Sequence, residues 1–416
     1  MKIGVLSNLY PPHALGGYER LCADVSLGLE KRGHEVVVLA SDFRVPKPSG
    51  ESRQSVDRDL QLIANYENLY NPLSISNDDR QSILNKNRRA LDAFIEKNRP
   101  DILFVWNLFF LGESLVKGVS YSGIPVVYFL TDNWLIADAH GERIGEFFTR
   151  FVHGAEMFNP ESTRSWSSDP VRAEYAIFGS RFVQNLYGYC GINFSNQAII
   201  HNGVNIPMVS EELRIDRRRY RSKNGLKLLF AGRVVDVKGL HMLVEALPKI
   251  IADAPAGAPV SLSIVGDRHD RQYVERIVSR IDQLGLANHV QFRDPVSEES
   301  LISLFNDHDI FVFPSVYEPF SLTLIHALAA GIPTVATDIG GNAEIVHDRE
   351  TGLLFDNGDI AGLAAAVVAL SRDAAMRVHV SEKGRRAAAR FTFDRMIRRI
   401  ERQLAAYLPA AANAGR

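Results

Sequence analysis

Short apolar runs and stretches of helical periodicity alternate along the whole chain. The runs that predict strands in the first half are Ile3–Leu6, Val36–Leu39, Ile102–Val105, Val126–Phe129, Ala176–Phe178 and Ala198–Ile200. Those in the second half are Leu228–Phe230, Ser261–Val265, Val290–Phe292, Ile310–Phe313, Thr334–Ala336 and Leu353–Phe355. Runs that are apolar throughout are typical of parallel sheets buried on both faces. The pattern therefore predicts an α/β protein with two doubly wound, Rossmann-like domains.

The predicted helices lie between these runs. They are Gly17–Arg32, closed by Gly33, then Leu240–Ile251, Gln272–Leu284, Glu298–Phe305, Ser321–Ala330 and the last helix, Phe393–Tyr407. We place the first domain at residues 1–205 and the second at 206–390. The terminal segment 391–416 contains this last helix and is expected to end in a frayed, alanine-rich tail from Ala410. Arg395, Arg398, Arg399 and Arg402 are expected on the solvent side of that helix.

Three polar segments are predicted to lack regular structure. Phe43–Asp59 and Met157–Asp169 read as loops of the first domain, either acceptor-binding or lid elements or surface loops without a role. Glu211–Gly225 reads as the connection between the domains. Its basic run fits a solvated linker or, alternatively, a phosphate or lipid-headgroup contact; it comprises Arg214, Arg217, Arg218, Arg219, Arg221 and Lys223.

Composition narrows the class of protein. A chain of 416 residues exceeds the size at which single cores stop growing, and its net charge of −2 provides no electrostatic argument for nucleic acid. Cys22 and Cys190 form no disulfide framework, which fits a reducing cytoplasm. No run approaches the roughly 18 apolar residues of a membrane span. We expect a cytoplasmic enzyme, with peripheral contact at the inner face of the membrane left open.

The most informative stretch runs from Glu318 to Pro333. A strand, Ile310–Phe313, leads into a polar loop with one carboxylate, and a helix with an uncharged first turn follows, ending at Gly331. The free backbone N–H groups of such a helix start suit a phosphate. Because a carboxylate repels phosphate, Glu318 is expected to face the hydroxyls of the molecule that carries it. Phosphate and hydroxyls together indicate a nucleotide sugar or a sugar phosphate.

This stretch resembles the donor-site signature of retaining glycosyltransferases of the GT-B fold, family four (glycosyl transferases group one). Further motifs similar to the family lie in order along the chain: Pro11–Arg20, Asn202–Val204, Leu228–Leu240 and Gly340–Val346. The resemblance implies two Rossmann-like domains facing a cleft, and a terminal helix within 391–416 that packs back on the first domain. It also implies that Arg233 and Lys238 hold the donor diphosphate, two fixed cations that can stabilise a leaving pyrophosphate without a metal. The other donor-binding positions it implies are Gly16, Gly17, Glu318, Phe320, Ser321, Leu322 and His326.

Two positions depart from the family pattern. A second glutamate usually lies eight residues after the first and binds the nucleotide ribose, and His326 stands there in this chain. An imidazole offers fewer acceptor sites than a carboxylate, so His326 either still holds the ribose or makes no ligand contact. Many members have a histidine directly before the aspartate of a strand-end motif in the first domain, where this chain has Thr131. Asp132 and Trp134 match, and the resemblance implies a catalytic part for Asp132.

The implied reaction transfers a sugar from a nucleoside diphosphate donor to an unidentified hydroxyl acceptor, with retention and with no cofactor. In the family, the leaving phosphate is thought to take the acceptor proton on the same face. Metal use is not expected, because no Asp-x-Asp pair follows a predicted strand and Arg233 and Lys238 are cationic. A nicotinamide oxidoreductase is disfavoured because no Gly-x-Gly-x-x-Gly follows the first strand. A nucleotide-sugar epimerase and a non-catalytic subunit of the same fold remain alternatives.

Overall fold

The computed structural model describes residues 1–45, 54–66, 74–136, 174–205, 225–255 and 259–408. These residues divide into two compact units. The first consists of Met1–Ile200 with Met396–Arg416, and the second of His201–Arg395. The predicted segments Met157–Asp169 and the basic run of the connection lie outside the described residues, as does the alanine-rich tail.

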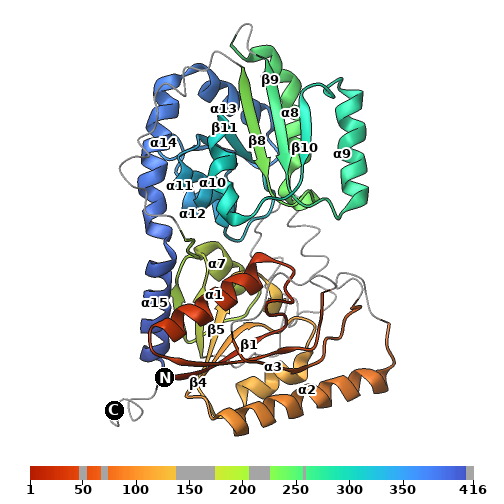
Figure 1. Ribbon diagram of the computed structural model, residues 1–416, viewed down its shortest axis with the longest axis vertical. Coiled ribbons are helices and arrows are strands. Elements are labelled where there is room, and N and C mark those ends of the chain that lie inside the picture. Colours follow the sequence, from red (N-terminus) through yellow and green to blue (C-terminus); the bar gives the residue numbers. More distant parts are fainter. Residues whose placement is uncertain (46–53, 67–73, 137–173, 206–224, 256–258, 409–416) are drawn as a thin grey trace. The chain divides into compact units, whose positions relative to one another are not determined.

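The first unit is built on a parallel sheet of seven strands (Figure 1). In chain order they are β1 (Lys2–Ser7), β2 (Glu35–Ser41), β3 (Val56–Leu60), β4 (Ile102–Asn107), β5 (Val126–Leu130), β6 (Tyr175–Phe178) and β7 (Asn196–Ile199). The spatial order is β3-β2-β1-β4-β5-β6-β7, so the chain reverses its winding direction between β1 and β4. Every residue of β4 is buried, as expected for a strand covered on both faces.

Helices α1 (Gly17–Lys31), α2 (Asn77–Asn98), α3 (Glu113–Ser120) and α7 (Arg181–Tyr189) flank this sheet. The helix α15 (Phe393–Ala406) belongs to the same unit from Met396 onward. Glu401 of α15 accepts hydrogen bonds from Arg32 and His34, and the ring of Tyr407 stacks on Tyr175 at 4.2 Å. The four arginines expected on the solvent side of this helix are exposed.

One loop prediction for the first unit is wrong at its C-terminal end. Phe43–Asp59 was expected to lack regular structure, yet Val56–Leu60 forms the edge strand β3, paired in parallel with β2. Residues 46–53 of the predicted loop lie outside the described residues. Its sequence, Val-Asp-Arg-Asp-Leu, is charged, and only Leu60 is buried. An edge strand needs no continuous apolar run because one of its sides stays open to solvent, and charge there discourages further strand pairing.

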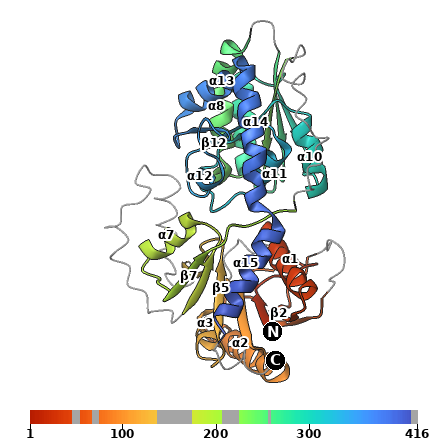
Figure 2. The ribbon, with the colours of Figure 1, turned by 90° about the vertical axis from the view of Figure 1, so that its left-hand side faces the viewer.

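The second unit contains a parallel sheet of six strands (Figure 2). They are β8 (Leu226–Ala231), β9 (Val260–Val265), β10 (Val290–Arg293), β11 (Ile310–Phe313), β12 (Thr334–Thr337) and β13 (Leu353–Phe355). Their order, β10-β9-β8-β11-β12-β13, is that of a doubly wound dinucleotide-type fold. Both described sheets thus confirm the predicted pair of Rossmann-like α/β domains.

Helices cover both faces of the second sheet. They are α8 (Leu240–Asp253), α9 (Arg271–Gln283), α10 (Glu298–Asn306), α11 (Leu322–Ala330), α12 (Asn342–Ile345), α13 (Ile360–Arg372) and α14 (Ala374–Ala388), with single 3-10 turns at Asp236–Lys238 and Ala389–Phe391. Helix α8 packs with α9 and α13, whereas α11 packs with α10 and α14. Residues 324–329 of α11 are all buried, and Leu324, Ile325 and Leu328 belong to the core of the second unit.

Candidate functional site

The candidate site lies where the winding of the second sheet reverses, between the neighbouring strands β8 and β11. In open parallel sheets, ligands bind outside the carboxyl ends of the strands at this point. The loop after β8 carries Arg233 and Lys238, and the loop after β11 carries Glu318. The topology therefore brings residues about 80 positions apart in sequence to one place.

Close backbone contacts hold these two loops together. The N–H of Val316 donates to the carbonyl of Val237 at 3.0 Å. Gly239 has a φ of +66°, and a Cβ atom built there would lie 1.8 Å from the carbonyl oxygen of Pro314. Only glycine fits such a position without displacing the neighbouring loop. The Lys-Gly step is thus a packing requirement of the site.

Lys238 and Glu318 form a direct ion pair. The Nζ of Lys238 lies 2.5 Å from Oε2 of Glu318, and the side chains are 17% and 8% exposed. The ammonium also lies 5.6 Å from the centre of the Phe313 ring, within cation–π range. The hydroxyl of Ser315 is 3.5 Å from the same carboxylate oxygen, at the long limit of a hydrogen bond. The sequence did not indicate that Lys238, expected to bind the phosphate, and Glu318, expected to bind the sugar, contact each other.

Arg233 differs from Lys238 in its surroundings. Its side chain is exposed, and the residues that the structure describes give its guanidinium no hydrogen-bond or ion-pair partner. It follows Gly232, whose carbonyl oxygen would lie 1.8 Å from a Cβ atom at Gly266. The loop after β8 is therefore packed tightly against the loop after β9, while the Arg233 side chain extends to solvent.

The N-terminus of α11 has the properties expected of an anion site. Ser321 is the N-cap, and its hydroxyl accepts from the N–H of Leu324 at 3.2 Å. The first turn carries no charged side chain. Within the described part of the chain, the N–H groups of Leu322 and Thr323 have no acceptor. The free donors and the helix dipole favour an anion beside Glu318 and Lys238.

Phe320 turns into the protein. Its side chain is buried, and its ring stacks on His201 with 5.0 Å between the centroids and 4° between the planes. His201 Nε2 is also 2.8 Å from Glu344 Oε2. The N–H of Gly341 donates to the carbonyl of Glu318 at 2.8 Å. Phe320 therefore positions the loop by packing, and its backbone is the part near the expected phosphate.

His326 lies in the second turn of α11 with only 7% of its side chain exposed, and its Nε2 is 3.1 Å from Oε1 of Glu298 on α10. The pair joins two helices that begin at the same edge of the sheet. Sequence reasoning missed Glu298 entirely. The sequence offered little sign of a role for Glu298, since a glutamate at the start of a helix is common and its contact, His326, lies 28 positions further along the chain.

The sequence-predicted residues of the first unit form a separate group. The N–H of Gly16 donates to the Glu19 side chain at 2.9 Å, while nothing lies within 4 Å of a Cβ atom at Gly17. The hydroxyl of Tyr18 reaches the carbonyls of Trp106 and Phe129. Asp132 accepts from the N–H of Trp134 at 3.2 Å.

Burial raises the pKa of Asp132 from 3.8 to about 7, although the hydrogen bond from Trp134 opposes the shift, and the negative charge of Glu19 adds to it. Burial and the nearby Asp132 likewise raise the pKa of Tyr18. The helix start at Gly16–Gly17 and the end of β5 are therefore close enough to interact electrostatically. Asp132 can hold a proton near neutral pH.

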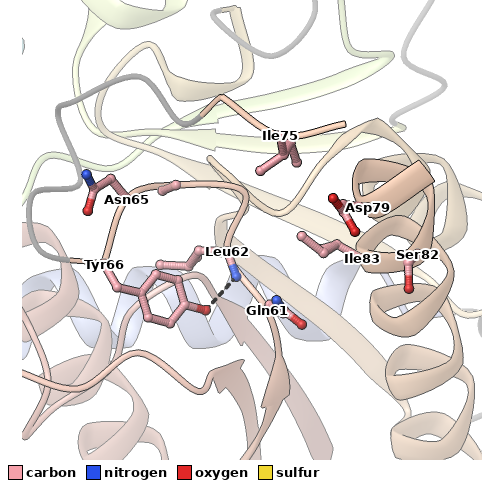
Figure 3. Close-up of a pocket in the computed structure, with 9 residues that line it drawn as sticks. Gln61, Leu62, Asn65, Tyr66, Ile75, Asp79, Ser82 and Ile83 are labelled. Atoms are coloured by element: carbon pink, nitrogen blue, oxygen red, sulfur yellow. Dashed lines mark hydrogen bonds between the residues drawn. The ribbon is translucent and has the colours of Figure 1, made fainter. Parts of the chain in front are cut away.

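The first unit also contains a pocket of about 690 Å³ at the carboxyl end of β3 (Figure 3). Figure 3 shows Asp79, Ser82 and Ile83 of α2 facing Tyr66 and Leu62 of the loop. Tyr66 is held by a bond from the N–H of Leu62 and donates to Asp42. The lining residues that the structure describes are Gln61, Leu62, Ala64, Asn65, Tyr66, Ile75, Asp79, Ser82 and Ile83. They offer hydroxyl, amide and carboxylate groups and one aromatic ring, and Lys86 Nζ donates to the Gln61 side chain at 3.0 Å.

Neither a metal centre nor a membrane span is found in the described residues. No three of their histidine, cysteine, aspartate and glutamate side chains gather as ligands for a metal ion. None of their helices is both long enough and apolar enough to cross a bilayer. Cys22 and Cys190 are buried, and neither is part of a disulfide.

The doubly wound second sheet, the cationic loop after β8 and the uncharged helix start after β11 define a doubly wound α/β protein with a candidate anion site at its switch point. Two family models match the chain in series. The model described as "Glycosyltransferase Family 4" matches residues 15–206, and that described as "Glycosyl transferases group 1" matches residues 213–387. The chain belongs to the group 1 glycosyltransferases of the GT-B fold, as the sequence motifs indicated.

Relatives and solved structures agree with this assignment. The chain is 26% identical to a glycogen synthase of Mycobacterium tuberculosis over 407 residues, covering 95% of this chain and 91% of that protein. A D-inositol 3-phosphate glycosyltransferase of Geodermatophilus obscurus is 32% identical over 205 residues, 47% of this chain and 43% of that protein.

Two solved structures share the fold. The sucrose-phosphate synthase of Thermosynechococcus elongatus has a TM-score of 0.70 at 20% identity, covering 97% of this chain and 99% of its own. Anabaena HepE in complex with UDP and glucose has a TM-score of 0.67 at 19% identity, covering 98% and 100%.

Proposed function

We propose that this glycosyltransferase moves a sugar from a nucleoside diphosphate donor to a hydroxyl acceptor, with retention of configuration and without a metal ion. The observation that carries the proposal is the buried Lys238–Glu318 pair beside the free N–H groups of α11. It sets a cation, an anion-binding helix start and a hydroxyl-binding carboxylate at the switch point of one sheet. A nucleoside diphosphate sugar carries the groups that match all three.

Lys238 and Arg233 are proposed to bind the diphosphate together with the N–H groups of Leu322 and Thr323. An ammonium has three N–H donors, so Lys238 can keep Glu318 as a partner and still donate to a phosphate oxygen. Negative charge develops on the diphosphate as the bond to the sugar breaks. Cations fixed in a partly buried site stabilise that charge more strongly than they would in water.

Glu318 is proposed to accept hydrogen bonds from hydroxyls of the donor sugar. Its pairing with Lys238 offsets the repulsion that a bare carboxylate would exert on the diphosphate. A glycosidase-like double displacement would need a second carboxylate across the bond. We therefore propose the family's retaining route, in which the leaving phosphate takes the acceptor proton on the same face.

For the acceptor, we propose a neutral sugar or polyol. The pocket beside α2 supports this class because its described lining is polar and contains the carboxylate of Asp79, while the nearby Lys86 is already paired with Gln61 and Asp42. The ring of Tyr66, which is 40% exposed, offers a flat apolar surface of the kind on which sugar rings pack. For the location, we propose the cytoplasm, with contact at the inner face of the membrane left open.

The test is an assay of donor turnover. Purified protein is incubated with UDP-, GDP- and ADP-sugars, with and without neutral and phosphorylated sugars as acceptors, and with a chelator. UDP-sugars come first because one similar structure was solved with UDP and glucose. Acceptor-dependent release of nucleoside diphosphate that survives the chelator supports the proposal, and NMR of the product reports the anomer.

Other outcomes favour the alternatives. Conversion of one nucleotide sugar into another without an acceptor would make the protein an epimerase. Binding of a nucleoside diphosphate with no turnover of any donor would favour a non-catalytic subunit. If no nucleoside diphosphate binds, the site is not a donor site.

A further inference from the structure

His326 and Glu298 form a pair whose two members differ sharply in exposure. The imidazole is 7% exposed, whereas the carboxylate side chain is 57% exposed, and His326 Nε2 lies 3.1 Å from Glu298 Oε1. A buried ring with its Nε2–H donating to a carboxylate oxygen restrains a side chain that would otherwise rotate freely. The histidine therefore holds a solvent-accessible carboxylate in one orientation.

The pair lies at the same edge of the sheet as the candidate diphosphate site. Helix α10 begins directly after β10 and the loop Asp294–Ser297, and α11 begins after β11 and the loop that contains Glu318. His326 is four residues beyond Leu322, which corresponds to about 6 Å along a helix axis. A group that contacts the pair is thus one helical turn from a phosphate bound at the start of α11.

The loop before α10 adds an apolar surface. Val296, two residues before Glu298, is 38% exposed in the second unit. The segment that leads into α10 therefore carries an exposed apolar side chain two residues from the carboxylate. A nucleoside diphosphate presents phosphate, vicinal hydroxyls and a flat base, which are the groups that an anion site, a carboxylate and an apolar side chain can contact.

We infer that Glu298, oriented by His326, accepts the ribose hydroxyls of the donor nucleotide. A carboxylate has acceptor sites for two neighbouring hydroxyls in addition to the bond from His326. This inference rests on the proposed function and moves the ribose contact expected at His326 to a residue on another helix. His326 acts as a positioning residue.

The experiment compares ribonucleotides with deoxyribonucleotides by calorimetry. The parent protein is titrated with UDP, GDP and ADP and with their 2′-deoxy and 3′-deoxy counterparts. We expect the parent to bind the ribonucleotide at least about 10-fold more tightly, because a deoxy ligand leaves a carboxylate acceptor unused. Glu298→Gln should reduce that ratio to about 2-fold or less while the bare affinity for the deoxy ligand changes little.

Two further variants separate positioning from direct contact. His326→Gln retains an N–H donor and should keep most of the preference for the ribonucleotide. His326→Ala should lose that preference. The double variant Glu298→Ala with His326→Glu places a carboxylate on α11 and should recover part of the ratio. Glu275→Gln, an exposed glutamate on α9, is the control and should match the parent.

The outcomes distinguish this inference from the proposed function. The role of Glu298 is overturned if Glu298→Gln leaves the preference for the ribonucleotide over the deoxyribonucleotide unchanged, or if the parent shows no such preference. In either case the nucleoside diphosphate still binds, and the proposed donor site is unaffected. Failure of all the nucleoside diphosphates to bind the parent overturns both. A Glu298→Gln variant that has lost the ratio and has the parent's melting temperature supports the assignment.

Discussion

The ammonium of Lys238 lies 2.5 Å from the carboxylate of Glu318, and both side chains are largely buried. Each residue therefore affects the stability of the protein as well as any ligand contact, because removal of either side chain leaves the other as a poorly solvated charge. Loss of one partner of a buried pair costs more than the pair itself contributes. Variants of this pair must therefore be assessed for stability as well as binding.

Lys238→Ala should weaken nucleoside diphosphate binding by about 10- to 100-fold, corresponding to about 1.5–3 kcal/mol for a charge-assisted hydrogen bond. It should also lower the free energy of unfolding, because Glu318 loses its partner. Calorimetry and denaturant unfolding measure the two effects. Lys249→Ala is the matched control, since Lys249 forms an exposed ion pair with Asp253 in the same unit. Equal diphosphate affinity in both variants would contradict the assignment of Lys238.

Arg233→Ala should weaken diphosphate binding by a similar factor and leave the free energy of unfolding nearly unchanged. The reason is that the Arg233 side chain is exposed and has no partner among the described residues. Calorimetry and denaturant unfolding measure the affinity and the stability of this variant, for comparison with Lys238→Ala. A large loss of stability without a loss of affinity would instead assign Arg233 a structural role.

Glu318→Gln should reduce binding of the nucleotide sugar more than binding of the bare diphosphate. Glu318 also pairs with Lys238, so its loss affects both ligands through the lysine, but only the nucleotide sugar loses the hydroxyl contact as well. Titration of the variant with both ligands gives the comparison, and glutamine keeps the volume of the side chain. An equal loss of affinity for the two ligands would contradict a contact between Glu318 and the sugar.

Gly239→Ala should destabilise the second unit and reduce diphosphate affinity. A Cβ atom there would lie 1.8 Å from the carbonyl oxygen of Pro314, so the loop that leads to Glu318 must move. Gly358→Ala is the control, because Gly358 also has a positive φ, +81°, but open space around it. The control should cost only the backbone strain, about 1–2 kcal/mol, and leave binding intact. Identical behaviour of the two variants would show that the loop yields freely.

Asp132→Asn should stabilise the protein at neutral and alkaline pH. Burial raises the pKa of Asp132 from 3.8 to about 7, so between these values the folded protein binds more protons than the unfolded chain. The free energy of unfolding then falls as pH rises through this window. Asparagine removes the penalty, which is on the order of a few kcal/mol above pH 7 and vanishes below about pH 4.

Urea unfolding at pH 5 and pH 8 measures this difference for Asp132→Asn, with Asp59→Asn as the control. Asp59 is an exposed aspartate of the same unit. The gain for Asp132→Asn should be larger at pH 8. A gain that is equal at both values would mean that Asp132 is ionised throughout.

The sequence by itself determined the class of fold and the position of the candidate donor motif. Buried parallel strands have no solvent face, so runs such as Ile310–Phe313 stand out against the amphipathic helices between them. Local cap chemistry likewise indicated where α11 begins and ends, because Ser321 and Gly331 satisfy needs of the backbone that arise within a few residues. The sequence did not predict strand β3, because an edge strand is held by main-chain hydrogen bonds and these form whatever the side chains are.

The tertiary structure alone decided which side chains meet. Lys238 and Glu318 are 80 positions apart, and Glu298 reaches His326 from another helix. No local pattern encodes these contacts, since they follow from the strand order that sets the loops after β8, β10 and β11 along one edge. Burial raises the pKa of Asp132, and the charge of Glu19, more than 100 positions away in sequence, adds to the shift, so its direction is set by the surrounding packing.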